Sequence, residues 1–350
     1  ILPSSFTPRG RGPASDTPRT LQTRQDLLGG RRTEKLYEKT AYLKDMLAKL
    51  DAVETPKLSA RPAPTPPANI RPRRLSITEI ETLIRDPYAI YAKHVLGLKK
   101  WRPLGAAPDS AERGNLIHDV LSDFVEQGFD FTAPDAHDKL MQIANRIYAR
   151  LDDVADRRDI WLKRFSAIAD KVITYEVARD PEIKQRHAEK LGVSQLPVGD
   201  QQFEIYGYAD RIDLQHDGAA ELIDFKTGSV PAAKDMQNYM SPQLPMEAMI
   251  LCHAGFKDVP KADADALTYI KLSHGPNPFE VTNFATGKQS LDGLIDDYWR
   301  HFSAYADIML MRDETAMVAK LMPKENQQFA GDYDQFARQK EWMIDQGDDE

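Results

Sequence analysis

Apolar and polar residues alternate most clearly between residues 203 and 227, where two apolar-rich runs flank a polar turn at 216–218. Such runs on either side of a short turn that contains glycine predict a β-hairpin. Side chains two positions apart on a strand share one face. Asp224 and Lys226 should therefore point to the same side, while Phe225 between them points into the opposite layer.

The pairing of the two predicted strands decides whether Asp210 joins Asp224 and Lys226. The length of the turn fixes which residues face each other, and a shift of one residue moves a side chain to the other face. A two-residue turn at Asp217 and Gly218 places Asp210 on the face opposite Asp224. A shared site therefore requires a three- or five-residue turn, or a β-bulge.

Helical spacing of apolar residues predicts most of the remaining elements. A helix begins at Ser76 or Thr78, both good N-cap residues, and Pro87 begins a second short helix. Further helices are predicted at residues 33–53, 111–126, most of 135–195, 241–255 and 291–312, with a later strand at 267–272. Together they indicate an α/β fold with a mixed sheet flanked by helices, and a site at the sheet edge where strands diverge.

Side-chain burial should follow the same spacing. In the helix predicted over 291–312, Trp299, Phe302 and Ile308 should face the core. Between residues 135 and 195, Glu176 and Glu189 should lie on a solvated helix surface.

The helix predicted over 111–126 is cleanly amphipathic at ~100° per residue, with apolar residues on one side and acidic residues on the other. Gly114 and His118 lie one turn apart on the rim of the apolar face. Gly114 permits close approach of a neighbouring sheet, and His118 can then reach it. A histidine on such a rim is either structural or a ligand.

Charge and proline content divide the chain. The residues before 75 carry 15 Lys and Arg against 7 Asp and Glu, net +8, whereas the remainder has a net charge of −16. We predict a basic arm and helix at 1–55 that ends a preceding region, a stiff proline-rich linker at 56–74, and a body at 75–350. The start at Ile1 rather than Met agrees with an excerpt from a longer protein.

Composition limits the class of protein. With 41% hydrophobic and 29% charged residues over 350 positions, the chain can bury a sizeable core. No apolar run approaches the ~18 residues of a membrane span, so we expect a cytoplasmic protein without a membrane partner. The single cysteine, Cys252, excludes an intrachain disulfide and any four-cysteine zinc or iron–sulfur site.

Two sequence motifs resemble those of a known nuclease family. The run Gly207-Tyr-Ala-Asp210-Arg-Ile-Asp213, followed by Asp224-Phe-Lys226-Thr, resembles the core of PD-(D/E)XK nucleases in their RecB-like branch. Gly114-Asn-Leu-Ile-His118 is similar to the Gly-x-x-x-His motif that supplies a metal ligand in that branch.

The resemblance implies a role for each motif residue. His118, Asp210, Asp224 and the backbone carbonyl of Phe225 would bind Mg²⁺ or Mn²⁺, since hard cations prefer such donors. Lys226 would orient or polarise the attacking water and offset the charge that develops on the phosphate.

A third stretch of sequence resembles one particular subgroup of these nucleases. Arg71-Pro-Arg-Arg-Leu-Ser-Ile-Thr-Glu-Ile-Glu to Asp86-Pro-Tyr-Ala-Ile-Tyr-Ala is similar to the start of the nuclease domain in AddB-type subunits of bacterial AddAB helicase–nucleases. Many relatives have a cysteine ligand of an iron–sulfur cluster at the position of Asp86, so we expect no cluster here. The family's Gln-x-x-x-Tyr pair corresponds to Gln243 and Glu247, so Gln243 is a candidate catalytic residue and the role of Glu247 stays open.

The resemblance implies a magnesium-dependent exonuclease that acts in double-strand-break repair on single-stranded DNA. An ATP-driven AddA-type helicase would feed the strand, since this chain has no glycine-rich phosphate loop. A catalytically silent DNA-binding scaffold and a stand-alone exonuclease are the alternatives. Two aspartates on one face disfavour the silent scaffold, because adjacent like charges are costly.

Overall fold

The computed structural model describes residues 42–43, 45–49, 60–101, 109–273, 277–284, 289–323 and 331–342. The chain divides into two compact units, residues 1–59 and 60–350. In the first unit, residues 42–43 and 45–49 are helical, in agreement with the helix predicted over 33–53. The rest of the predicted basic arm at 1–55 lies outside the described residues.

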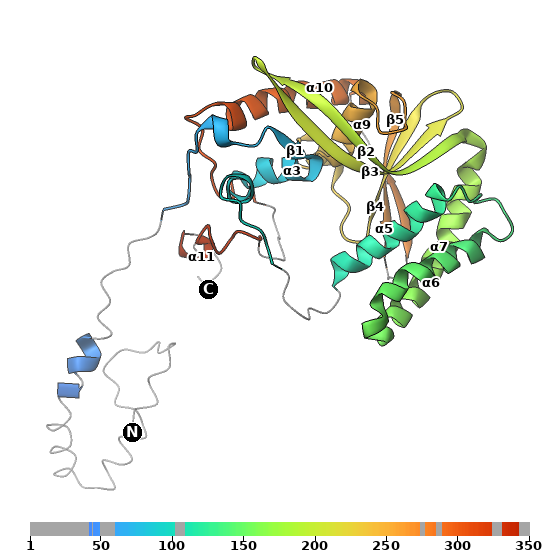
Figure 1. Ribbon diagram of the computed structural model, residues 1–350, viewed down its shortest axis with the longest axis horizontal. Helices are drawn as coiled ribbons and strands as arrows, with labels where there is room; N and C mark the ends of the chain where they lie inside the picture. The colour runs from blue at the N-terminus through green and yellow to red at the C-terminus, as the bar shows by residue number, and fades with distance from the viewer. Residues whose placement is uncertain are drawn as a thin grey trace, which may run out of the picture. The chain divides into compact units, whose positions relative to one another are not determined.

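A six-stranded mixed sheet forms the centre of the second unit (Figure 1). Its strands are β1 (Arg74–Ser76), β2 (Ile183–Val198), β3 (Gln201–Gln215), β4 (Ala220–Lys226), β5 (Ala264–Leu272) and β6 (Phe279–Asn283). Neighbouring strands run antiparallel except for β1 beside β3 and β4 beside β5, which are parallel. The predicted mixed sheet, including the central hairpin and the later strand, is confirmed.

The turn of the β3–β4 hairpin has the odd length that a shared site requires. Arg211 pairs with Ile223 and Leu214 with Ala220. The Gln215 N–H then donates to the Ala219 carbonyl at 2.8 Å, which leaves three residues, 216–218, in the turn. Gly218 has a φ of 97°, a left-handed conformation that glycine adopts without strain. This register continues to Asp210 opposite Asp224, so the two-residue turn is excluded.

Two strands, β1 and β4, share one edge of β3 and pair with different parts of it. Strand β2 pairs with β3 over almost its whole length, so β1 and β4 both occupy the opposite edge. Strand β1 pairs with residues 204–206 of β3, and β4 pairs with residues 211–214. Asp210 therefore lies in the interval between β1 and β4, where the strands diverge as predicted.

Helices cover both faces of this sheet (Figure 1). The longer helices are α3 (Ile77–Arg85), α5 (Ser110–Glu126), α6 (Ala136–Tyr148), α7 (Ala155–Arg179), α9 (Gln243–His253) and α10 (Leu291–Ala306). The short helical segments are η1 (Ala68–Ile70), α4 (Pro87–Ile90), η2 (Tyr91–Val95), η3 (Ala149–Val154), η4 (Asp180–Glu182), α8 (Ala233–Gln237), η5 (Asp307–Met311) and α11 (Gln339–Trp342). No helix among the described residues is long and apolar enough to cross a bilayer.

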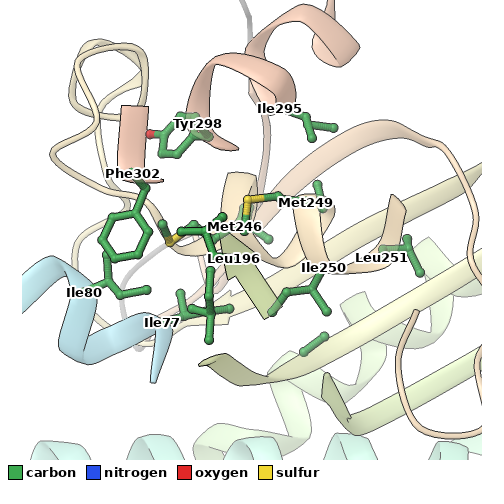
Figure 2. Packing of buried hydrophobic residues seen from close by; sticks show 14 of the residues in the cluster. Ile77, Ile80, Leu196, Met246, Met249, Ile250, Leu251, Ile295, Tyr298 and Phe302 are labelled. Carbon is green, nitrogen blue, oxygen red and sulfur yellow. The ribbon is translucent and has the colours of Figure 1, made fainter. Parts of the chain in front are cut away.

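Each face of the sheet has its own hydrophobic core. Helices α5, α6 and α7 pack with Ile223, Phe225 and Ile270 on one face. Helices α3, α9 and α10 pack on the other, where Ile80, Met246 and Phe302 meet (Figure 2). Because Phe225 belongs to the first core, its strand neighbours Asp224 and Lys226 face the second layer, as the alternation predicts.

Several predicted helix boundaries are confirmed. Ser76, rather than Thr78, caps α3: its hydroxyl accepts the Glu79 backbone N–H, and Glu79 accepts the Ser76 N–H. Pro87 occupies the first turn of α4. Gly255, with a φ of 79°, follows the end of α9.

Two expectations about the helices are wrong. The helical region predicted through residue 195 ends near 182, because strand β2 begins at Ile183 and pairs with β3. Ile308 is 45% exposed, and Met309 and Leu310 are buried in its place. The π-helical turn η5 shifts the side chains there out of the helical phase of α10.

The described part of the proline-rich segment, residues 60–73, belongs to the second unit. The carbonyl groups of Pro62 and Pro64 accept backbone N–H groups of Ala319 and Met317. Arg71 is 2% exposed and donates to backbone carbonyl oxygens, including that of Met309 at 2.7 Å. Residues 60–73 therefore do not act as the free spacer that a linker at 56–74 implies; the domain division itself stays a prediction.

A buried network of ion pairs lies between the sheet and α7. Asp213, which is fully buried, binds Arg179 at 2.9 Å and Arg211 at 2.5 Å. Glu176 binds Arg211 at 3.2 Å and Arg186 at 3.1 Å. The expectation that Glu176 lies on solvated surface is therefore wrong, and Asp213 of the nuclease-like motif serves this network.

Asp86 is structural in this chain. It accepts the backbone N–H of Lys320 at 3.0 Å, and its carboxylate lies 3.6 Å from the Lys320 ammonium. Lys320 also binds Asp334 at 2.7 Å. These contacts join the start of α4 to the segment that precedes α11.

Candidate active site

Two aspartates meet where β3 and β4 diverge. Asp210 is partly exposed on β3, whereas Asp224, near the end of β4, is 1% exposed. The Asp210 Oδ2 atom accepts the backbone N–H of Phe225 at 2.9 Å, which fixes its carboxylate beside β4. The three-residue turn thus brings the two acidic groups of the motif together.

Lys226 and Gln243 complete a polar cluster on the α9 side of the sheet. The Lys226 Nζ atom lies 2.7 Å from Asp224 Oδ2 and donates to Gln243 Oε1 at 2.8 Å. The Gln243 amide donates in turn to Asp224 Oδ1. Burial disfavours the ammonium, but the charge of Asp224 outweighs that effect and raises the pKa of Lys226, which therefore stays charged.

His118 reaches this cluster from α5, on the other side of the sheet. A Cβ atom on Gly114 would lie 2.9 Å from Thr227 Oγ1, so only glycine permits this approach of α5 to the end of β4. His118 Nδ1 lies 3.3 Å from Asp210 Oδ2. Burial by itself lowers the pKa of His118, but the contact with Asp210 and its charge raise it to about 9.

Glu189 also lies at this site, although the sequence predicted it on solvated helix surface. It lies on β2 between Ala188 and Lys190, whose partners on β3 flank Asp210. Ligand atoms of His118, Glu189 and Asp210 all lie within 4.8 Å of one another. Burial and the charge of Asp210 raise the pKa of Glu189 to about 7. No local sequence signal identifies this part of the strand, because residues 183–191 show no regular alternation of apolar and polar positions.

Glu247 replaces the tyrosine of the family motif and is almost fully buried, at 2% exposed. It accepts the Gln243 amide at 3.3 Å, while its Oε2 atom has no hydrogen-bond partner. Burial and the charge of Asp224 raise the pKa of Glu247 well above its usual range. Glu247 therefore supports Gln243 from within α9 instead of facing solvent.

The donor set fits a divalent cation. Carboxylate oxygens and an imidazole nitrogen are suitable ligands for Mg²⁺ or Mn²⁺. Burial and the charge of Asp210 raise the pKa of Asp224 to about 7, a crowding of like charge that a cation relieves. The Oδ2 atom of Asp224 is buried without a hydrogen bond, although it contacts the Lys226 ammonium.

The backbone N–H and carbonyl of Phe225 point toward Asp210 and the proposed metal site. The Phe225 N–H donates a hydrogen bond to the Asp210 carboxylate. In a β-strand the N–H and the C=O of one residue point to the same side, toward the same neighbouring strand. The carbonyl therefore lies on the side of Asp210, as its predicted ligand role requires. The structure brings together His118, Asp210, Asp224, Phe225, Lys226 and Gln243.

Comparison with known proteins gives matches of sequence and of structure. Uncharacterized proteins of Rickettsia conorii and Rickettsia felis are 33% and 32% identical to this chain over 189 residues. The match covers 53% of this chain but only 23% and 22% of those relatives, so the chain spans less than a quarter of their length. The crystal structure of SSO0001 aligns over 83% of this chain and 90% of its own, at 11% identity and a TM-score of 0.29.

The family comparison covers the whole site. The model of the PD-(D/E)XK nuclease superfamily matches residues 74–346, which include the sheet, α5 and α9. All the residues that meet at the end of β4 lie within this match. The chain therefore belongs to the PD-(D/E)XK nuclease superfamily.

Proposed function

We propose that this chain is a metal-dependent deoxyribonuclease domain that hydrolyses the phosphodiester backbone of single-stranded DNA. The observation that carries the proposal is the convergence of Asp210, Asp224, Lys226 and His118 at the end of β4 in a member of a nuclease superfamily. Such a site binds the phosphate backbone and carries little information about base sequence.

The roles follow from the contacts. His118, Asp210, Asp224 and the carbonyl of Phe225 would hold Mg²⁺ or Mn²⁺. The ion, when bound, polarises the scissile phosphate and lowers the pKa of a bound water. Lys226, held by Asp224 and Gln243, would orient the attacking water and offset negative charge on the phosphate. Gln243 keeps the ammonium and the carboxylate in fixed positions.

Replacing Lys226 by alanine should lower kcat by about 10²-fold, the usual scale for losing one electrostatic contributor. Because its proposed role is on the water and the phosphate, Mn²⁺ affinity should change little. Steady-state cleavage of a labelled oligonucleotide and equilibrium Mn²⁺ titration measure the two quantities. Lys271→Ala, on the neighbouring strand β5, is the matched control and should cleave at the wild-type rate. An equal loss of Mn²⁺ affinity in Lys226→Ala would mark the lysine as structural.

We further propose that the domain works as the AddB-type partner of an ATP-driven AddA-type helicase in DNA double-strand-break repair. The net charge of −16 after residue 74 opposes tight binding to DNA, so tethering to a motor would supply the effective concentration that the domain lacks. The much greater length of the Rickettsia relatives supports a role within a larger protein.

A cleavage assay on single-stranded and duplex DNA tests both parts. With Mg²⁺ and without ATP, the chain should cut single-stranded DNA slowly and distributively, and EDTA should stop the reaction. No cleavage by protein that retains Mn²⁺ binding would favour the silent scaffold. Processive degradation of long duplex DNA without ATP or a partner would favour the stand-alone exonuclease instead.

A further inference from the structure

Glu189 occupies an unusual backbone position beside the site. Its φ is 47°, a left-handed value that a residue with a Cβ atom adopts at a cost. Its neighbours Ala188 and Lys190 both pair with β3, so the distortion is confined to the residue that lies across from Asp210. Within the described strand, β2 departs from regular pairing where it meets the candidate active site.

The Glu189 carboxylate faces the His118 imidazole and the Asp210 carboxylate, and no lysine or arginine among the described residues pairs with it. The Glu189 carboxylate makes no hydrogen bond or ion pair with any described residue. The adjacent Lys190 approaches a different carboxylate, that of Glu126, at 3.6 Å. Its ligand oxygen, one of Asp210 and a nitrogen of His118 lie within 4.8 Å of one another. These three side chains come from β2, β3 and α5, so three separate elements converge there.

The neighbouring acid gives an independent indication of a missing positive charge. The Asp224 carboxylate is 1% exposed, and its Oδ2 atom already pairs with the Lys226 ammonium at 2.7 Å. Lys226 neutralises one carboxylate at most, which leaves those of Asp210 and Glu189 beside a single imidazole. A bound divalent cation would balance this excess.

We infer that Glu189 is a further metal ligand, a third carboxylate that binds the same divalent cation as His118 and Asp210. This inference rests on the proposed function, because it concerns the ion of that site. The family motifs supply His118, Asp210 and Asp224 but no residue of β2, so the inferred ligand set is larger than the motifs imply. The left-handed backbone turns the Glu189 side chain into the ligand cluster.

Equilibrium titration of the full chain with Mn²⁺, followed by electron paramagnetic resonance of free Mn²⁺, tests the inference without reference to activity. Glu189→Gln, which is nearly isosteric, should weaken Mn²⁺ binding at least about tenfold. Glu126→Gln is the matched control: it removes the same charge from the neighbouring end of α5, where Glu126 is 49% exposed and outside the ligand cluster. Its Mn²⁺ affinity should change less than about threefold.

A second variant, Glu189→Gly, tests whether a loss of Mn²⁺ binding could come from misfolding. Glycine adopts the left-handed backbone of residue 189 without strain, so this variant should fold. The metal-free variant should unfold at the wild-type temperature or higher and still show the tenfold loss. Wild-type affinity in Glu189→Gln, or equal losses in Glu189→Gln and Glu126→Gln, would overturn the inference while leaving a cleaving wild type intact. A wild-type chain that binds Mn²⁺ through Glu189 but cuts no DNA would instead overturn the proposed nuclease.

Discussion

Replacing Asp224 by alanine is expected to abolish DNA cleavage, with a loss in kcat of about 10³-fold or more, because the substitution removes a proposed metal ligand and a partner of Lys226. Single-turnover cleavage with saturating Mg²⁺ measures the loss. Asp265→Ala provides the control, since Asp265 is an exposed acid on the neighbouring strand β5 and should leave the rate unchanged.

The same variant should fold as well as the wild type. In the folded chain the pKa of Asp224 is raised to about 7 by burial and by the charge of Asp210. A carboxyl group whose folded pKa lies above its unfolded value destabilises the fold increasingly as pH rises toward that folded value. At pH 8 in EDTA, Asp224→Ala should therefore unfold at the wild-type temperature or slightly above it. Wild-type cleavage by Asp224→Ala would refute the proposed site.

Replacing Arg211 by methionine should lower the free energy of unfolding by about 3–5 kcal/mol, the scale for removing one partner from a buried ion pair. Arg211 is 2% exposed, and its loss leaves Asp213 and Glu176 short of a counter-charge in the layer between sheet and α7. Urea-induced unfolding monitored by circular dichroism measures the change.

A surface pair supplies the comparison for Arg211. Arg74 binds Glu204 at 3.2 Å, but its side chain is 62% exposed, so Arg74→Met should cost less than about 1 kcal/mol. If Arg211→Met and Arg74→Met lost similar amounts of unfolding free energy, burial would not explain how much the Arg211 network stabilises the fold. A network of this kind, beneath the hairpin that carries Asp210, holds β3 and β4 against α7.

The hairpin and the positions of its charged side chains were predictable because both depend on local periodicity. Alternation places Asp224 and Lys226 on one face. Asp210 can join them only with a three- or five-residue turn or a bulge, and the three-residue turn meets this condition. Helical spacing likewise places Gly114 and His118 on one rim of the apolar face of α5. The structure agrees, because Gly114 lies against Thr227 and His118 lies against Asp210.

The errors arose where tertiary context overrides local pattern. Residues 183–198 have no strong alternation of apolar residues, and only pairing with β3 makes them a strand. Glu189 was therefore placed on a helix surface and left out of the site. Ile308 was expected in the core because the π-helical turn at 307–311 cannot be inferred from a constant helical period.

The sequence by itself determined the nuclease motifs, the mixed fold, the cap at Ser76 as one of two choices, and the side of the sheet that Asp224 and Lys226 occupy. These features depend on contacts within a few residues, where spacing dictates geometry. Only the tertiary structure decided that Glu189 lies across from Asp210, and that Asp213 and Glu176 belong to a buried ion network. Such contacts join residues far apart in the chain, so no local period encodes them.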